Sequence, residues 1–256
     1  MPDPASPLSA GQLYRAALER LRFEQSMGIE VLPRHDLAAP AAPAAHASAT
    51  LPAAPRMEAP APSLIPAGDV AARWAALEAR VKVCEQCELH KGRTQTVFGV
   101  GNRSAELVFV GEAPGEDEDR EGEPFVGRAG QLLNKIIGAM KWRREDVFIC
   151  NTIKCRPPNN RPPLPDEISA CNAFLVEQIE LIQPKVIVAL GSPAAKTLLC
   201  TTAGIMSLRG RWHAYRNIPV MPTYHPAFLL RQYTEENRRA VWEDMKKVAD
   251  KLAEKT

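Results

Sequence analysis

Short apolar runs alternate with longer amphipathic segments along the chain from about residue 69 onward. Residues 107–110, 147–150, 186–190 and a run near 219–223 are apolar at almost every position. Strands that are buried on both faces have this pattern, which is typical of a parallel sheet between helices. Helices are predicted around these strands, over 69–83, 129–140, 166–182, 193–199 and 235–253. The alternation predicts a three-layer α/β domain.

The first 67 residues have a different pattern. Residues 9–27 are predicted to form a helix that Ser9 caps and Gly28 ends. The alternatives are that this helix packs on the domain, that it docks a protein partner, or that the segment is mostly disordered. Residues 36–67 contain thirteen Ala and seven Pro, and such a stretch predicts a disordered, semi-extended linker. We therefore expect an accessory segment over 1–35, a linker over 36–67 and a folded domain over 68–256.

Overall charge adds little to this picture. The chain carries a net charge of +2. Residues 1–67 hold five Arg and six acidic residues, a net charge of −1, so the remainder has a net charge of +3. Any nucleic-acid binding must therefore depend on a local arrangement of groups. The start of the chain lacks a basic region followed by an apolar core, and no apolar run approaches the ~20 residues that span a bilayer. We expect a cytoplasmic, nucleoid-associated protein that is monomeric and does not contact a membrane.

Six cysteines are spread over the predicted domain. Cys84 and Cys87 form a C-x-x-C pair, Cys155 follows the second predicted strand, and Cys171 lies in a predicted helix. Four thiolates can hold a tetrahedral zinc ion or a four-iron cluster. The spacing alone leaves a cluster, zinc and no metal as alternatives. The fifth cysteine lies within a predicted strand and the sixth at a helix end, so we interpret them as a core and a peripheral residue.

Candidate chemistry lies in the segments that follow the strands, because sites in parallel sheets form beyond the carboxyl ends of the strands. After the first strand, the Gly/Pro-rich turn 111–115 lets backbone approach a ligand closely, although no phosphate-binding Lys-Ser/Thr follows. Its acidic continuation is interpreted as a solvated loop. Asn151 ends the second strand and can offer both a donor and an acceptor to a base edge. After the fourth strand, His225 precedes the apolar run 228–230, which we interpret as an exposed loop.

Taken together, these segments resemble the family 4 uracil-DNA glycosylases, the iron–sulfur members of the uracil-DNA glycosylase superfamily. The resemblance extends over roughly residues 75–252. It implies a four-stranded parallel sheet between helices, and it implies a [4Fe-4S] cluster on the four cysteines in place of zinc. The matching segments are 111–115, 122–133, 151–158, 208–212 and 225–231, together with Cys84, Cys87, Cys155 and Cys171.

Roles in uracil binding follow from the resemblance by position. Gly111, Glu112 and Ala113 would form the loop that meets uracil, and Phe125 would stack on the base. Asn151 would hydrogen-bond the polar edge, and His225 would approach O2. The residues expected to contact DNA are Asn160, Arg161, Ser192, Leu229 and Arg231, with Leu229 filling the space that the flipped nucleotide leaves.

The catalytic group that activates water stays open at this stage. His225 is the candidate donor to the leaving uracil anion, and either Glu112 or Glu118 could orient water or offset the cationic sugar. The best-known relatives use an Asp in the first-strand loop, where this chain has Ala113. That departure leaves the general base unassigned.

The resemblance implies a monofunctional DNA-repair enzyme. It would flip uracil out of single- or double-stranded DNA, hydrolyse the N-glycosidic bond and leave an abasic site. A uracil-DNA binding protein that traps the base is the alternative, but the basic, His-containing loop of such relatives is missing from 200–209. A zinc deaminase would need a His-x-Glu pair before Pro-Cys-x-x-Cys, which this chain lacks. An inactive polymerase partner is disfavoured because the Glu112, Asn151 and His225 set is intact.

Overall fold

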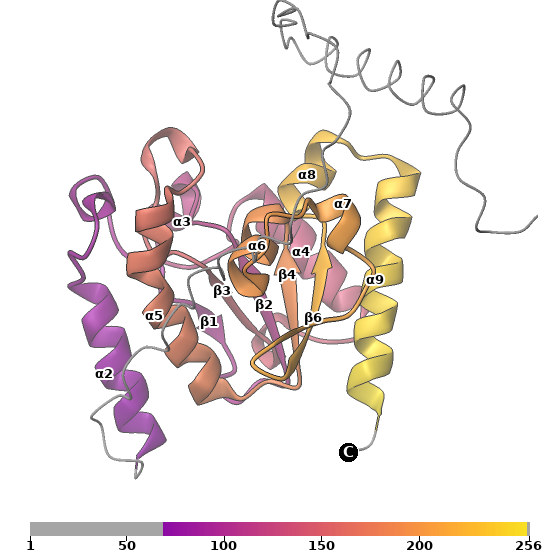
Figure 1. The fold of residues 1–256 in the computed structure, drawn as a ribbon, viewed down its shortest axis with the longest axis horizontal. Helices are drawn as coiled ribbons and strands as arrows, with labels where there is room; N and C mark the ends of the chain where they lie inside the picture. Colours follow the sequence, from indigo (N-terminus) through magenta and orange to yellow (C-terminus); the bar gives the residue numbers. More distant parts are fainter. Residues whose placement is uncertain (1–68, 255–256) are drawn as a thin grey trace, which may run out of the picture. The chain divides into compact units, whose positions relative to one another are not determined.

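The four apolar runs form the centre of one sheet in the computed structural model, which describes residues 69–254 (Figure 1). They are β2 (Leu107–Gly111), β3 (Phe148–Asn151), β4 (Val186–Leu190) and β6 (Ile218–Thr223). Their spatial order is β3-β2-β4-β6, and all three pairings are parallel. The predicted three-layer α/β fold with a central four-stranded parallel sheet is therefore confirmed.

Two short edge strands extend the sheet beyond the prediction. β1 (Val100–Gly101) pairs antiparallel with β3, and β5 (His213–Tyr215) pairs antiparallel with β6. Strands of two or three residues have too few positions to show an alternating or apolar pattern. The six-stranded order β1-β3-β2-β4-β6-β5 thus places antiparallel strands only at the two edges of the described sheet.

Side chains that alternate along each strand divide the core into two layers. Val108 and Val110 face one layer, whereas Leu107 and Phe109 face the other. This is the period-two geometry of a strand that is buried on both faces. The first layer is covered by α2 (Val70–Lys82), α5 (Pro165–Ile182) and α6 (Ser192–Leu199). The second is covered by α4 (Arg128–Ala139), α8 (Pro226–Arg231) and α9 (Glu235–Ala253).

Local capping explains where the long helices begin. Asp69 accepts hydrogen bonds from the Ala71 and Ala72 amides at the start of α2, and the Thr234 hydroxyl accepts from the Asn237 amide at the start of α9. Such caps satisfy amides that have no partner within the helix. The five long helices begin and end within about one residue of the predicted bounds.

Several short helices were not predicted. The acidic segment interpreted as a solvated loop contains α3 (Glu116–Glu121), and the segment after the fourth strand forms α8 and not an exposed loop. Both interpretations were wrong, because helices of six residues depend on tertiary contacts and caps more than on periodicity. The remaining short elements are α7 (Ile205–Leu208) and the 3-10 turns Glu88–Lys91, Arg144–Asp146 and Pro158–Asn160.

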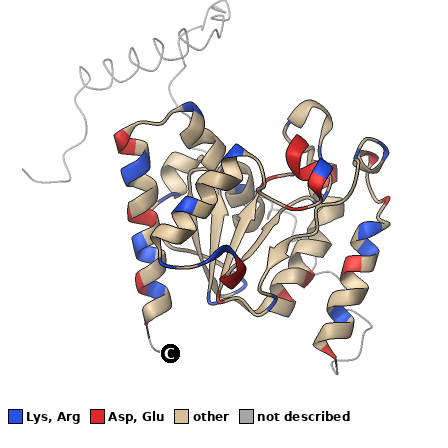
Figure 2. Cartoon of the chain, turned by 180° about the vertical axis from the view of Figure 1, so that it is seen from behind, with Lys and Arg blue, Asp and Glu red and all other residues tan. Residues whose placement is uncertain are grey.

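Most charged residues between 69 and 254 lie outside the two core layers, and Lys154 and Asp244 are among the few that are buried. Figure 2 shows both signs alternating along α9, while the sheet carries few charged residues. None of the helices between residues 69 and 254 has the length and apolar character needed to cross a membrane. The predicted helix 9–27 and linker 36–67 lie outside the described residues, and the domain boundary at residue 68 stays a prediction.

Candidate active site and cysteine site

A pocket opens beyond the carboxyl ends of the parallel strands, where the sequence predicted the site. It collects residues from the segments after β2, β3 and β6, including Pro114, Gly115, Ala129, Pro157 and Ala227. Most of the predicted site residues line it, namely Glu112, Ala113, Glu118, Phe125, Asn151, Asn160, Arg161, His225 and Arg231.

Asn151 is buried at the floor of this pocket. It ends β3 opposite Gly111 of β2, and its side-chain Oδ1 is buried without a hydrogen-bond partner among the described residues. A buried polar atom without a partner costs about 1–3 kcal/mol, so an unpaired acceptor at this place indicates a ligand donor. A Cβ on Gly111 would lie 2.3 Å from Oδ1 and 2.6 Å from the Phe125 ring. Glycine is therefore needed at 111 to admit both side chains.

Phe125 supplies an aromatic wall. Its ring centroid lies 5.5 Å from that of His225, with the planes inclined by 31°. Its backbone is left-handed, with φ at 55°, which is uncommon for a bulky residue and is found where the surroundings enforce it. Gly130 allows α4 to start against this backbone, since a Cβ there would lie 1.7 Å from the Phe125 carbonyl oxygen. The Phe125 ring is thus positioned by its neighbours.

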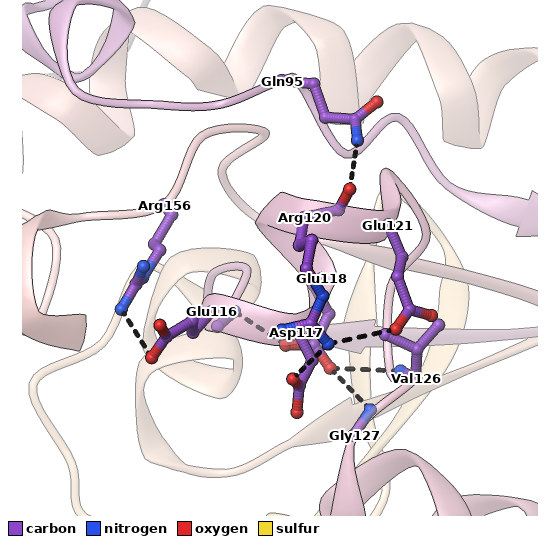
Figure 3. A network of polar contacts seen from close by, with 10 residues as sticks. Gln95, Glu116, Asp117, Glu118, Arg120, Glu121, Val126, Gly127 and Arg156 are labelled. Atoms are coloured by element: carbon purple, nitrogen blue, oxygen red, sulfur yellow. Dashed lines mark hydrogen bonds and ion pairs between the residues drawn. The ribbon is translucent and has the colours of Figure 1, made fainter.

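Glu118 is one of the groups that enforce this loop conformation (Figure 3). One carboxylate oxygen accepts from the Gly115 amide at 2.9 Å, and the other accepts from the amides of Val126 at 3.1 Å and Gly127 at 3.3 Å. The carboxylate therefore connects the turn after β2 to the residues that follow Phe125. Both oxygens are occupied by backbone donors, which leaves Glu118 poorly placed to activate water.

Glu112 has a different environment. It is half-buried in the pocket wall next to Ala113, and no hydrogen bond reaches its carboxylate from residues 69–254. Burial raises the pKa of the Glu112 carboxyl above its ordinary value. A carboxylate that is poorly solvated and unpaired is the better candidate to orient water or to face a developing positive charge.

His225 caps the N-terminus of α8, and this contact fixes its tautomer. Its Nδ1 accepts a hydrogen bond from the Ala227 amide at 3.1 Å, so the neutral ring carries its proton on Nε2. Burial, and secondarily the positive charge of Arg231, lower the pKa of His225 to about 4. The ring is therefore neutral at pH 7 and presents an N–H donor to the pocket.

The wedge role of Leu229 stays a prediction, and in the described structure its side chain is not exposed. Because 225–231 folds as a helix cap and helix, Leu229 points into the core, where it is only 3% exposed and packs with α9 residues such as Val241. Phe228 and Leu230 are the partly exposed members of the apolar run. Ser192 begins α6 at the carboxyl end of β4 and is not among the residues that line the pocket.

The predicted DNA-contacting residues at the pocket rim differ in how free their side chains are. The Arg161 guanidinium makes two hydrogen bonds to Glu167, at 2.9 and 2.6 Å, and this carboxylate also caps α5. The Asn160 side chain accepts from Arg156. Arg231 is exposed and forms no ion pair within the part of the chain that the structure describes. Arg231 is thus the rim cation best able to meet a phosphate.

The four predicted cysteine ligands come together in the core layer that α2 and α5 cover. Cys84 and Cys87 follow α2, Cys155 follows β3, and Cys171 projects from α5, and all four line one cavity. Two nitrogens donate to sulfur there: Arg93 Nη1 to Cys155 at 3.2 Å, and the Lys154 amide to Cys171 at 3.3 Å. The cysteine in β3 is buried and the one at the end of α6 is exposed, as predicted.

A thiol set with N–H donors aimed at sulfur fits a group that is bound through thiolates. Burial raises the pKa of Cys171 to about 12, so a metal centre must displace its proton on binding. Within residues 69–254, no three His, Cys, Asp or Glu side chains are arranged to hold a single metal ion.

Sequence comparisons agree with this geometry. A family model described as the uracil DNA glycosylase superfamily matches residues 98–246. A type-4 uracil-DNA glycosylase of Thermotoga maritima is 51% identical over 172 residues, which cover 66% of this chain and 88% of the relative. The type-4 enzyme of Archaeoglobus fulgidus is 45% identical, with 67% and 89% covered. A type-5 uracil-DNA glycosylase of Pyrobaculum aerophilum is 31% identical, with 50% and 63% covered.

Proposed function

The chain belongs to the uracil-DNA glycosylase superfamily and to its type-4 branch, and we propose that it excises uracil with the residues of the pocket described above. It is a DNA-repair glycosylase that hydrolyses the N-glycosidic bond and releases free uracil. The main support for placing uracil in this pocket is the buried Oδ1 of Asn151, which has no hydrogen-bond partner among the described residues.

Asn151 reads the base. Its Oδ1 faces the N3–H of uracil, and its amide NH2 faces O4. Cytosine reverses both groups, with a bare N3 and an amino group at position 4. Two mismatched contacts in a buried pocket, at about 1–3 kcal/mol each, reject cytosine by roughly thirtyfold or more. The Phe125 ring stacks on the base, and a stack of this kind contributes about 1–3 kcal/mol.

His225 stabilises the leaving group. As the glycosidic bond breaks, the electron pair passes to uracil, and negative charge develops at O2 and O4 of the ring. The neutral His225 ring donates its Nε2–H toward O2, since Nδ1 is already occupied by the Ala227 amide. A fixed donor in a buried site stabilises such a charge without the cost of reorienting solvent.

Glu112 is the carboxylate we assign to the sugar side of the reaction. The carboxylate holds the water that adds to the anomeric carbon, and its negative charge offsets the oxocarbenium character of the sugar. Ala113 offers no such group. Glu118 acts indirectly, because its hydrogen bonds to three backbone amides hold the turn after β2 and the residues next to Phe125.

Cys84, Cys87, Cys155 and Cys171 are assigned as the ligands of a [4Fe-4S] cluster. The support is the all-thiol donor set, the two N–H donors directed at sulfur, and membership of the type-4 branch. When bound, the cluster cross-links the segment after α2 to β3 and α5, and hydrolysis of a glycosidic bond needs no electron transfer. Its role in this proposal is therefore structural.

A single assay tests the proposed function. The purified protein is incubated with an oligonucleotide that contains one uracil, and abasic sites are then cleaved with alkali. We expect strand cleavage at the uracil with the parent protein, none with a thymine control strand, and a rate at least tenfold lower with Glu112→Gln. Binding of the uracil strand without alkali-labile product would instead support the uracil-binding alternative.

A further inference from the structure

Lys154 is a fully buried lysine that lies between the base pocket and the cysteine site. It is 1% exposed, and it follows Asn151 by three residues and precedes Cys155. Its ammonium donates to the Asn151 carbonyl at 2.8 Å and to the Gln178 side-chain oxygen at 2.7 Å. Its own amide donates to the Cys171 sulfur. One residue thus contacts both the strand end that carries the base reader and a predicted cluster ligand.

No carboxylate pairs with this ammonium in the part of the chain that the structure describes. Neither of its hydrogen-bond partners is ionised, and Lys154 takes part in none of the ion pairs found between residues 69 and 254. A buried charge is tolerated when a counter-charge lies near. The thiolates of a bound four-iron cluster would supply that negative charge on the Cys171 side.

Gln178 fixes the other end of the lysine. It is fully buried in α5, accepts from Lys154 through its oxygen, and donates through its nitrogen to the Phe98 carbonyl at 2.9 Å. The amide orientation is therefore set by two partners of opposite type. The ammonium is held from α5 and has little freedom to move away from Asn151.

We propose that Lys154 is a positioning residue that couples the cluster to uracil recognition, by using the cluster as its counter-charge and the Asn151 carbonyl as its anchor. This rests on the proposed function, in which Asn151 reads uracil and the four cysteines hold the cluster. The hydrogen bond from Lys154 fixes the peptide that follows Asn151, and so fixes the direction of the Asn151 side chain. In this way the cluster supports base reading without electron transfer.

The test combines Lys154→Met with Asn151→Ala in the full-length, cluster-bound protein. Methionine keeps the volume and removes the charge and both hydrogen bonds. We expect Lys154→Met to keep the parental iron content, to shift the cluster potential to a more negative value, and to slow single-turnover uracil excision by about tenfold or more. In the Asn151→Ala background, the same change should cost less than about threefold, because residues that act through one group are not additive. Lys135→Met, which removes an exposed lysine from α4, is the control and should alter none of these values.

Several outcomes would overturn the proposal. Losses that multiply in the double variant would show that Lys154 does not act through Asn151, as would parental excision by an iron-replete Lys154→Met protein. If Lys154→Met does not fold, Gln178→Glu serves instead. It gives Lys154 a carboxylate partner and keeps the Asn151 contact, although it removes the hydrogen bond to the Phe98 carbonyl. Excision should therefore stay within about threefold of the parent while the cluster potential still falls. A loss as large as that of Asn151→Ala would refute the coupling. Failure of the proposed function is seen separately, as a parent protein without iron or as an Asn151→Ala variant that excises normally.

Discussion

Replacing Glu118 distinguishes a carboxylate that shapes the pocket from one that performs chemistry. In Glu118→Ala, three backbone amides lose their shared acceptor, and Phe125 loses the contacts that favour its left-handed backbone. A hydrogen bond to a charged group contributes about 1.5–3 kcal/mol when fully buried. Glu118 is half-buried, so we expect the three together to contribute about 3 kcal/mol to the stability of the domain.

The expected effect on catalysis follows from the stack. Loss of an ordered Phe125 ring should remove about 1–3 kcal/mol of base binding, which corresponds to a roughly 5- to 150-fold weaker inhibition by free uracil and a similar loss in excision rate. Glu118→Gln keeps a single acceptor oxygen and should fall between the parent and Glu118→Ala.

The pH profile of single-turnover excision decides between the two roles. If Glu112 must be ionised, the rate falls as the pH drops through the raised pKa of its carboxyl. Glu118→Gln should keep this decline, whereas Glu112→Gln should abolish it. The reasoning is refuted if Glu118→Gln loses the decline and the neutral-pH rate while free uracil still inhibits at the parental concentration. Glu118 would then be the water-activating group.

Three further predictions concern other parts of the domain. His225 has a folded pKa of about 4 against an ordinary 6.5, so stability should fall by roughly 3 kcal/mol as pH drops from 7 to 4; denaturant midpoints of the parent and His225→Asn should converge at acid pH, and parallel curves would exclude a buried neutral ring. Leu229→Ala should cost about 2–5 kcal/mol of stability as a core truncation and slow excision from duplex and single strands equally; a selective loss on duplex DNA would instead support the wedge role. The purified protein should be brown, with about four irons per chain, and replacing Cys171 by Ser should reduce the iron content; stoichiometric zinc would contradict the cluster assignment.

The sequence was sufficient for the parts of the fold that follow from periodicity. Every residue of strand 186–190 is apolar because both faces of that strand are buried, and the predicted bounds are those of β4. β1 and β5 could not be predicted, since two or three residues at a sheet edge have no pattern of their own. The position of the pocket was predictable because strand ends in parallel sheets converge.

Details of individual side chains depended on tertiary contacts. The burial of Leu229 could not be predicted, because a six-residue helix capped by His225 turns it into the core. The role of Glu118 could not be inferred from the acidic run, since two of its three amide partners lie eight and nine residues further along the chain. The role of Lys154 was also missed. A lysine between Ile153 and Cys155, just after a buried strand, could have been recognised as a candidate buried charge.

The central claim is that Asn151 reads the base, and single-turnover release of uracil, cytosine and thymine from otherwise identical strands tests it most directly. Asn151→Asp keeps the acceptor for N3–H and loses the donor to O4. The account predicts slower release of uracil and relaxed discrimination against cytosine, while discrimination against thymine is unchanged because thymine has the same edge as uracil. Uracil release at the parental rate with unchanged selectivity would contradict the placement of uracil against Asn151.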